Sequence, residues 1–265
     1  PSMDLGLQGR AAFVAGASRG LGYAAALELA REGARVALCG RQRDRIEAAA
    51  AQISAESGAE TLPLVADVTD PHAVQQAIGQ TAERFDGLQI VVTNAGGAPS
   101  GNFDDLDDEM WEAAWRLNFQ SHLRLIRAAL PHLRAAGWGR IITITSLAVK
   151  LPLDGLMLSN GVRPGVVGLV RSLANELAAE GITVNNVAPG FTATERVDQL
   201  IAARAAQQGI SHAEAARALT AQIPMQRMGT ASEQAAVIAF LASARAAFIT
   251  GQTLLVDGGQ YGGLF

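Results

Sequence analysis

The stretch AAFVAGASRGLG, residues 11–22, decides the fold. The apolar run Ala11–Ala15 predicts a strand that leads into a glycine-rich turn, and the turn leads into a helix predicted over Leu21–Arg31. Backbone amides and the helix dipole can hold a pyrophosphate in such a turn. A glycine cluster alone indicates only a tight turn, but its place at the first strand–helix junction favours a dinucleotide site. The residues expected to contact the cofactor there are Gly16, Ser18, Arg19, Gly20, Leu21 and Gly22.

The rest of the chain repeats this alternation. The further predicted strands are Arg35–Cys39, Thr61–Ala66, Leu88–Thr93, Ile141–Thr145, Thr183–Val187 and Thr253–Val256. The further predicted helices are Asp44–Ser57, His72–Phe85, Asp108–Ala136, Val162–Glu180 and Glu233–Ser243, with two helical patches within Glu195–Gln222. Apolar strands alternating with helices predict a parallel sheet covered by helices on both faces. We find no linker and no internal repeat, so residues 1–265 are predicted to form one doubly wound α/β domain.

The composition narrows the class of protein. Of 265 residues, 49% are hydrophobic and 17% are charged, with a net charge of −4, which excludes a disordered, collagen-like or disulfide-scaffold chain. This mild acidity indicates no nucleic-acid partner. No apolar run reaches the ~18 residues that a membrane span needs. A single cysteine, Cys39, and the lack of a secretion signal predict a cytoplasmic protein, with Pro1 and Ser2 a cloning remnant before Met3. The four scattered histidines predict no metal site.

The end of the second predicted strand distinguishes the two nicotinamide cofactors. That strand runs into Cys39-Gly40-Arg41, and no carboxylate follows before Asp44. An acidic residue at this point would bind the ribose 2′-hydroxyl of NAD(H), whereas a basic one accommodates the 2′-phosphate of NADP(H). Guanidinium groups match a phosphate in geometry and charge, so Arg41 and Arg19 together favour NADP(H) over NAD(H). The alternative is that Arg41 is only a solvated residue at a helix start.

Further motifs follow the later strands. They are Asp67-Val68 after the third strand, Asn94-Ala95-Gly96 after the fourth, Asn118 in the long helix, Ser146 after the fifth strand, Pro189-Gly190 with Thr192 and Thr194 after the sixth, and Val256-Asp257-Gly258-Gly259 near the end. In this order they resemble the short-chain dehydrogenase/reductase superfamily over nearly the whole chain, and in particular its 3-oxoacyl-carrier-protein reductase-like members.

This resemblance implies a Rossmann-type sheet ordered 3-2-1-4-5-6-7 and a homotetramer or homodimer built on long helices. It also implies hydride transfer between a nicotinamide and a carbonyl or alcohol. It assigns adenine contact to Asp67 and Val68, a further part of the cofactor site to residues 94–96, and nicotinamide contact to residues 189–194. Asn118 and Ser146 match members of the family's catalytic tetrad.

The other two members of that tetrad are missing. The family has a tyrosine 13 residues after the serine and a lysine four residues later, whereas this chain has Ser159 and Arg163. A serine hydroxyl is a far weaker acid than a phenol, whose pKa is about 10. Arginine stays protonated, so Arg163 can stabilise negative charge or bind the cofactor ribose but cannot relay a proton. The ordinary tyrosine mechanism is therefore absent.

Lys150 is a candidate replacement. It is the only lysine in the chain and lies four residues after Ser146, in a loop that borders the substrate pocket in related folds. A lysine desolvated there can act as a general acid, and we hypothesise that Lys150 acts with Ser146 and Ser159 in place of the tyrosine. A solvated loop lysine is the alternative. Pro164 belongs in a first helical turn, so the next helix is predicted to begin near Ser159 or Asn160, one of which would cap it.

Three segments are expected to surround the substrate. They are Gly97–Asp105, the loop after Lys150, and Glu195–Gln222 as a lid, with an apolar wall of Phe103, Leu151, Leu153, Leu156, Met157 and Phe191. We therefore predict an NADP(H)-dependent oxidoreductase of an apolar carbonyl or alcohol. One alternative is the same fold acting on another bond, such as an imine. Another is a cofactor-binding protein with a decayed tetrad, serving as a sensor or assembly partner.

Overall fold

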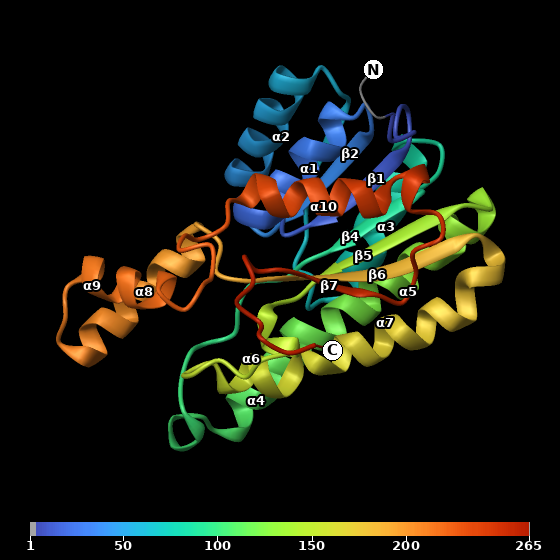
Figure 1. The fold of residues 1–265 in the computed structure, drawn as a ribbon. Coiled ribbons are helices and arrows are strands. Elements are labelled where there is room, and N and C mark those ends of the chain that lie inside the picture. Colours follow the sequence, from blue (N-terminus) through green and yellow to red (C-terminus); the bar gives the residue numbers. More distant parts are fainter. Residues whose placement is uncertain (1–3, 265) are drawn as a thin grey trace.

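In this computed structural model, which describes residues 4–264, one parallel sheet of seven strands organises the chain (Figure 1). The strands are β1 (Ala11–Ala15), β2 (Arg35–Gly40), β3 (Thr61–Val65), β4 (Ile90–Thr93), β5 (Gly139–Ile144), β6 (Ile182–Pro189) and β7 (Thr253–Val256). Their order is β3-β2-β1-β4-β5-β6-β7, and each neighbouring pair is parallel. The predicted Rossmann-type topology is confirmed.

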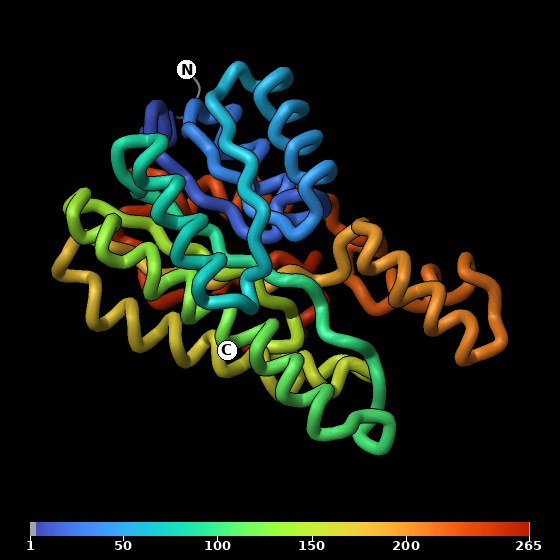
Figure 2. The backbone as a smooth tube through the Cα atoms, turned by 180° about the vertical axis from the view of Figure 1, so that it is seen from behind, coloured from blue at the N-terminus to red at the C-terminus, as the bar shows by residue number. Residues whose placement is uncertain are grey.

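Three helices cover each face of the sheet (Figures 1 and 2). Helices α1 (Gly20–Arg31), α2 (Arg43–Ser57) and α10 (Ala231–Ala242) pack on one face, and α3 (Pro71–Arg84), α5 (Ser121–Ala136) and α7 (Pro164–Leu177) pack on the other. Two separate cores result, one on each side of the sheet. Strand β1 is apolar throughout and β4 is apolar up to Thr93, and both are buried because both of their faces lie against helices.

The order of the strands reverses between β1 and β4. Strand β1 pairs with β2 on one side and with β4 on the other, so the loops that leave β1 and β4 part to opposite faces. In open parallel sheets, ligands bind at the carboxyl ends of the strands at such a point. The glycine turn and residues 94–96 both lie there.

Two helices differ from the prediction. The expected helix Asp108–Ala136 consists of α4 (Asp108–Trp115), a π-helical turn η2 (Arg116–Gln120) and α5. The helix expected to begin near Ser159 or Asn160 begins earlier, as α6 (Met157–Val162), and α7 follows directly from Pro164. Neither predicted cap is correct: Ser159 lies inside α6, and the Asn160 amide instead bonds both backbone groups of Leu153. The break falls at Arg163 because Pro164 lacks the N–H of an interior position.

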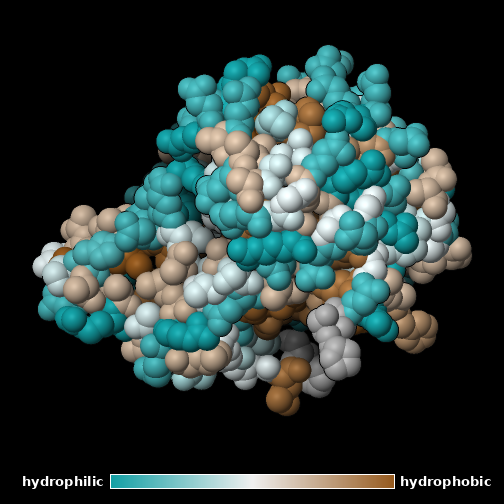
Figure 3. Space-filling model, turned by 90° about the horizontal axis from the view of Figure 1, so that it is seen from above, coloured by the Kyte–Doolittle hydropathy of each residue, from teal (hydrophilic) through white to brown (hydrophobic). Residues whose placement is uncertain are grey.

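Residues 195–222 form the two helices that the sequence predicts. These are α8 (Glu195–Gln208) and α9 (His212–Thr220), which project from the body of the molecule (Figures 1 and 3). They share a small core of their own, made by Ile201, Ala205, Ala215, Leu219 and Ile223. A lobe held by so few apolar side chains can move relative to the sheet.

No helix within residues 4–264 is long and apolar enough to cross a membrane.

Candidate active site

The glycine turn allows helix α1 to begin very close to the end of strand β1. Gly16 and Gly20 have φ values of +60°, which glycine adopts without strain. A β-carbon on Gly22 would lie 2.2 Å from the carbonyl oxygen of Gly16, so only glycine allows α1 to start this close to β1. No side chain caps α1 and no acidic residue occupies its first turn. Its first amides, those of Gly20 to Gly22, therefore have no partner within the helix and suit a pyrophosphate.

Neighbouring strands hold this turn in place. The Asn94 amide donates to the carbonyl oxygens of Ala15 and Gly16, at 3.3 and 3.4 Å. Thr194 lies on the other side, with its methyl group 3.9 Å from the position a β-carbon of Gly20 would take. The structure thus brings together the motifs at residues 16–22, 94–96 and 189–194, which are far apart in the sequence.

Arg41 belongs to the expected adenosine part of the cofactor site. It is exposed at the end of β2, and its charge acts on Asp67 after β3. Burial raises the pKa of Asp67, but hydrogen bonds from the Thr69 backbone and hydroxyl, and then the charge of Arg41, lower it below the ordinary value overall. Val68, beside Asp67, is half-buried against the core. Arg41, rather than the ionised Asp67, is the group here that suits a phosphate.

Arg19 differs from the expectation. Its guanidinium donates to the Glu195 carboxylate at the start of α8 and does not turn toward Arg41. Both side chains are more than half exposed, so the pair contributes little to stability. A phosphate would therefore compete for Arg19 with a carboxylate 176 positions away, and the two-arginine phosphate site stays a prediction.

In the segment expected to contact the nicotinamide, residues 189–194, Gly190 and Thr192 contact neighbouring elements, whereas Thr194 lies against the glycine turn. Gly190 approaches β7 so closely that a β-carbon would lie 2.7 Å from Cα of Asp257. Thr192 is buried, with its hydroxyl bonded to the carbonyl oxygen of Gly190 and to the Gln234 amide. Thr194 caps α8 by accepting from the N–H of Val197. Thr192 thus shapes the segment, and Thr194 borders the glycine turn with its methyl group.

Asn118 lies at the centre of the π-helical turn. Its amide donates to the carbonyl oxygen of Gly96 at 2.8 Å, and this bond joins the helix to the loop after β4. Its Oδ1 is buried and has no partner among residues 4–264. Gly96 is exposed, and no atom lies within 4 Å of the position that a β-carbon on it would take, which leaves open space beside this loop. An orphaned buried acceptor next to open space fits a ligand.

Ser146 and Ser159 belong to adjoining elements. Ser146 follows β5 and caps a short 3-10 turn, η3 (Leu147–Val149), by accepting from the N–H of Ala148 at 3.1 Å. Helix α6, which carries Ser159, packs against η3. Ser159 is 8% exposed, and its carbonyl oxygen accepts from the N–H of Arg163 one turn later.

Arg163 is almost completely buried, with 6% of its surface exposed. Burial, and then the charge of Arg196, lower the pKa of its guanidinium to about 10. The group stays protonated at neutral pH. No side-chain hydrogen bond or ion pair of Arg163 is formed within residues 4–264. A permanent cation therefore lies buried one helical turn after Ser159.

Lys150 is exposed at the end of η3. The desolvation expected for its ammonium group is therefore wrong, because the loop after β5 turns this side chain outward. A role for the lysine in supplying protons stays a prediction.

His122 is a residue that the sequence analysis did not single out. It lies one turn after Asn118, is fully buried, and its Nδ1 is 2.7 Å from Oγ1 of Thr93 at the end of β4. Burial, and then the charge of Arg163, lower its pKa to about 3. Its Nε2 has no partner in the described part of the chain. Only the spacing of four from Asn118, which puts both on one helix face, pointed to it.

A cavity of about 440 Å³ opens between the loop 100–105, the loop 153–156 and the lobe. Its lining includes Leu153, Leu156 and Phe191 of the expected apolar wall, together with polar side chains from α8 such as Arg204 and Gln207. Phe103 is 69% exposed and does not line this cavity, in contrast to the expectation. Leu151 and Met157 are half-buried and do not line this cavity. The lining is thus mixed on both sides, because Asp105 and Asp154 of the two loops also line the cavity and the lobe adds apolar Leu200 and Leu219.

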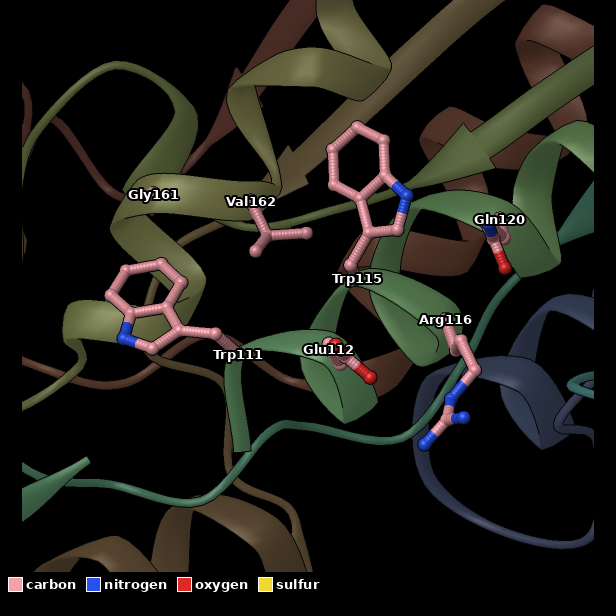
Figure 4. A pocket seen from close by; sticks show the side chains of 7 residues that line it. All are labelled: Trp111, Glu112, Trp115, Arg116, Gln120, Gly161 and Val162. Atoms are coloured by element: carbon pink, nitrogen blue, oxygen red, sulfur yellow. The ribbon is translucent and has the colours of Figure 1, made fainter. Parts of the chain in front are cut away.

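A second cavity, of about 560 Å³, lies on the outer side of α4 and α6 (Figure 4). The rings of Trp111 and Trp115 flank it, with Val162 between them and Gly161 beside Trp111. Trp115 stacks on Phe119 with ring centroids 4.1 Å apart, yet it is 42% exposed. The lining of this groove is completed by the polar residues Glu112, Arg116 and Gln120.

No group of three metal-ligating side chains occurs among residues 4–264.

Comparison with known proteins gives the family. Residues 16–260 match the family model described as enoyl-(acyl carrier protein) reductase. The chain is 37% identical over 257 residues to the 3-oxoacyl-[acyl-carrier-protein] reductase FabG of Pseudomonas aeruginosa, a match that covers 97% of this chain and 99% of that protein. It is 36% identical to the corresponding reductase of Escherichia coli, with the same coverage.

Solved structures agree with this match. L-sorbose reductase from Gluconobacter frateurii, complexed with NADPH and L-sorbose, has a TM-score of 0.94 and 30% identity, covering 99% of this chain and 100% of that one. Actinorhodin polyketide ketoreductase with NADPH has a TM-score of 0.91 and 30% identity, covering 95% and 97%. Sequence and fold together show that this chain, an oxidoreductase of carbonyl or alcohol groups, belongs to the short-chain dehydrogenase/reductase family.

Proposed function

We propose that this protein is an NADP(H)-dependent reductase of a carbonyl compound whose reacting end is apolar, with a proton donor other than tyrosine. The observation that carries the proposal is Arg163, a permanent cation almost fully buried one helical turn from Ser159. The NADPH of two structurally similar reductases supports the cofactor, and so do Arg41 and the absence of a carboxylate between residues 40 and 44.

NADPH, when bound along the glycine turn, supplies the hydride. Negative charge then develops on the carbonyl oxygen of the substrate. Ser146 and Ser159 donate hydrogen bonds to that oxygen, and the guanidinium of Arg163 stabilises the charge in a site with little water. Asn118 holds the loop at Gly96 and thereby the shape of the site. Lys150, at the exposed edge of the same 3-10 turn as Ser146, returns a proton from solvent.

The proposal that the substrate has an apolar end rests on three apolar residues of the substrate cavity. Leu153, Leu156 and Phe191 lie there, and the lobe formed by α8 and α9 closes over it as a lid. Glu195 ties the lid to the glycine turn through Arg19.

We also propose that the protein is a cytoplasmic homodimer or homotetramer. Its one cysteine, Cys39, is buried and free, as in proteins of a reducing compartment. The Trp111–Trp115 groove provides an exposed apolar face next to α5 and α7, the long helices on which a second copy can pack (Figure 4).

The test is the consumption of NADPH by the purified protein with a panel of aliphatic and aromatic ketones, followed by the loss of NADPH absorbance. We expect turnover of ketones and a loss of at least about 100-fold in kcat for Arg163→Gln, the range found when an oxyanion donor is removed. Tight NADPH binding without turnover of any ketone or imine would instead indicate a cofactor-binding sensor or assembly partner. Turnover of imines alone would indicate imine reduction.

A further inference from the structure

The side chain of Asn160 is bound to a turn that lines the substrate cavity. Its Nδ2 donates to the carbonyl oxygen of Leu153 at 2.9 Å, and its Oδ1 accepts from the N–H of the same residue at 3.0 Å. The amide group thus pairs with Leu153 as a residue of a neighbouring strand would. Asn160 follows Ser159 directly, so one short helix, α6, carries both a residue of the proposed reacting centre and the residue that holds this turn.

Residues 153–156 form a closed β-turn. The N–H of Leu156 donates to the carbonyl oxygen of Leu153 at 3.1 Å, and Gly155 has a φ of +71°, which glycine adopts readily in a turn. The carbonyl oxygen of Leu156 accepts from the N–H of Asn160 at 2.9 Å. Asn160 therefore holds the turn at both ends, through its side chain at Leu153 and through its backbone at Leu156.

The same turn holds the other loop that lines this side of the cavity. The N–H of Gly101 donates to the carbonyl oxygen of Gly155 at 2.8 Å, and Gly101 forms a parallel bridge with Leu156. Within the loop 100–105, the Asp105 carboxylate accepts from the N–H of Asn102 at 2.9 Å. The two loops are thus one hydrogen-bonded unit that Asn160 joins to α6.

The lobe formed by α8 and α9 supplies the other side of the cavity. It has a small core of its own and can move relative to the sheet, so it can adjust to substrates of different size. A surface that is held in place discriminates between ligands by fit. In this cavity the surface held in place is that of the two loops, with Leu153 and Leu156 as its apolar side chains.

We propose that Asn160 determines substrate specificity: by holding Leu153 and Leu156, it sets the length of aliphatic chain that the cavity accepts beside the reacting carbonyl. Asn160 is a positioning residue, because it acts through the turn. The inference rests on the proposed reductase function and specifies its substrates as ketones with an extended aliphatic chain. Asp105 and Asp154, the two carboxylates of the lining, are both exposed. Leu153 and Leu156 are half-buried and offer the chain an apolar surface.

Binding without turnover provides the test. Straight-chain 2-alkanols from 2-butanol to 2-octanol are titrated into the protein saturated with NADPH, and the change in NADPH fluorescence gives Kd. The reduced cofactor cannot accept a hydride, so the alcohols do not react. In the parent protein, each added methylene that lies along the turn is expected to tighten binding about fourfold, the value for a buried CH₂.

Asn160→Ala removes both side-chain bonds to the turn. The turn is then expected to move and the chain to lose its contact, so that the gain per methylene falls below about twofold. Hydrogen exchange of residues 151–156 should become faster. Asn160→Asp still accepts from the N–H of Leu153 but cannot donate to its carbonyl oxygen. Its gain per methylene should lie between those of the parent and of Asn160→Ala.

Asn185 in β6 provides a matched control. Its amide also donates to one backbone carbonyl oxygen, that of Ile249 at 2.8 Å, and accepts from one backbone N–H, that of Gln252 at 3.1 Å. None of these three residues lines the cavity. Asn185→Ala removes the same two kinds of bond and is expected to keep the parent's gain per methylene.

The proposal is overturned if the parent shows no gain with chain length, if Asn160→Ala keeps the parent's gain, or if Asn185→Ala loses it to the same extent. NADPH consumption with ketones judges the reductase function separately. Turnover of ketones with no dependence of binding on chain length would refute only the role of Asn160. The expected discrimination among alcohols without turnover of any ketone would refute only the reductase function.

Discussion

The imidazole of His122 bonds to the hydroxyl of Thr93 at 2.7 Å, so the end of β4 is tied to the helix that carries Asn118. Because burial and Arg163 keep this ring neutral, its pKa falls from 6.5 to about 3 in the folded protein. In the unfolded chain the ring titrates normally. The unfolded state therefore binds more protons below pH 6.5, and the free energy of unfolding decreases as the pH falls from there toward 3.

His122→Gln is expected to remove this dependence. The amide of glutamine does not titrate. Between about pH 6 and pH 4 the unfolding free energy of the variant should therefore change less steeply than that of the parent protein, by up to about 1.4 kcal/mol per pH unit. Urea unfolding at several pH values measures the slope. His72→Gln, at an exposed position, is the control and should keep the slope of the parent protein. Equal slopes for His122→Gln and the parent would contradict the prediction.

Gly22 and Gly79 form a matched pair. A β-carbon on Gly22 would meet the Gly16 carbonyl oxygen at 2.2 Å, whereas a β-carbon on Gly79 in α3 would meet nothing within 4 Å. Gly22→Ala is expected to cost about 1–3 kcal/mol of stability and to weaken NADPH binding more than tenfold, because α1 must move away from β1. Gly79→Ala should stabilise the protein by about 0.5–1 kcal/mol. Thermal unfolding and NADPH titration distinguish them, and equal effects would refute this interpretation of the turn.

Arg41 is expected to determine the cofactor preference. Arg41→Ser should raise the Kd of NADPH roughly ten- to hundredfold and leave that of NADH unchanged, since hydrogen bonds to charged groups contribute about 1.5–3 kcal/mol. Arg19→Gln should have a smaller effect because Glu195 already holds Arg19. Arg43→Ser, which removes a neighbouring exposed arginine paired with Glu47, is the control. Fluorescence titration with both cofactors provides the measurement, and tighter NADH binding by the parent would refute the assignment.

The sequence contained enough information for the strands, their order and the cofactor motifs. Runs such as Ala11–Ala15 are buried on both faces and have no other place in a folded chain. The sequence did not contain the π-helical turn, because Arg116–Gln120 includes no helix breaker, and the turn accompanies a bond from Asn118 to Gly96. The sequence also did not reveal which groups the long arginine side chains contact. The partner of Arg19 is 176 residues away, and the approach of Arg196 to Ala98 spans 98 residues.

Lys150 provides a test of the proton donor. It is the only lysine, so Lys150→Met and Lys150→Arg remove the only ammonium side chain in the protein. If Lys150 returns the proton, both variants should lower kcat by at least about tenfold with unchanged NADPH affinity, because arginine does not release a proton near neutral pH. Steady-state kinetics and NADPH titration measure the two quantities. Full activity of Lys150→Met would show that solvent protonates the product directly.

The Trp111–Trp115 groove should hold a second copy of the chain. Trp115 is 42% exposed although it stacks on Phe119, so a partner can cover it without disturbing the fold. Trp115→Glu would place a charge in that apolar contact, and we expect the molar mass from light scattering to fall from that of a dimer or tetramer to a smaller species. Phe103→Glu introduces the same charge at a residue that is 69% exposed on a loop, and should leave the mass unchanged. Circular dichroism checks that both variants fold. A folded Trp115→Glu protein with the parent's mass would show that this face is not the interface.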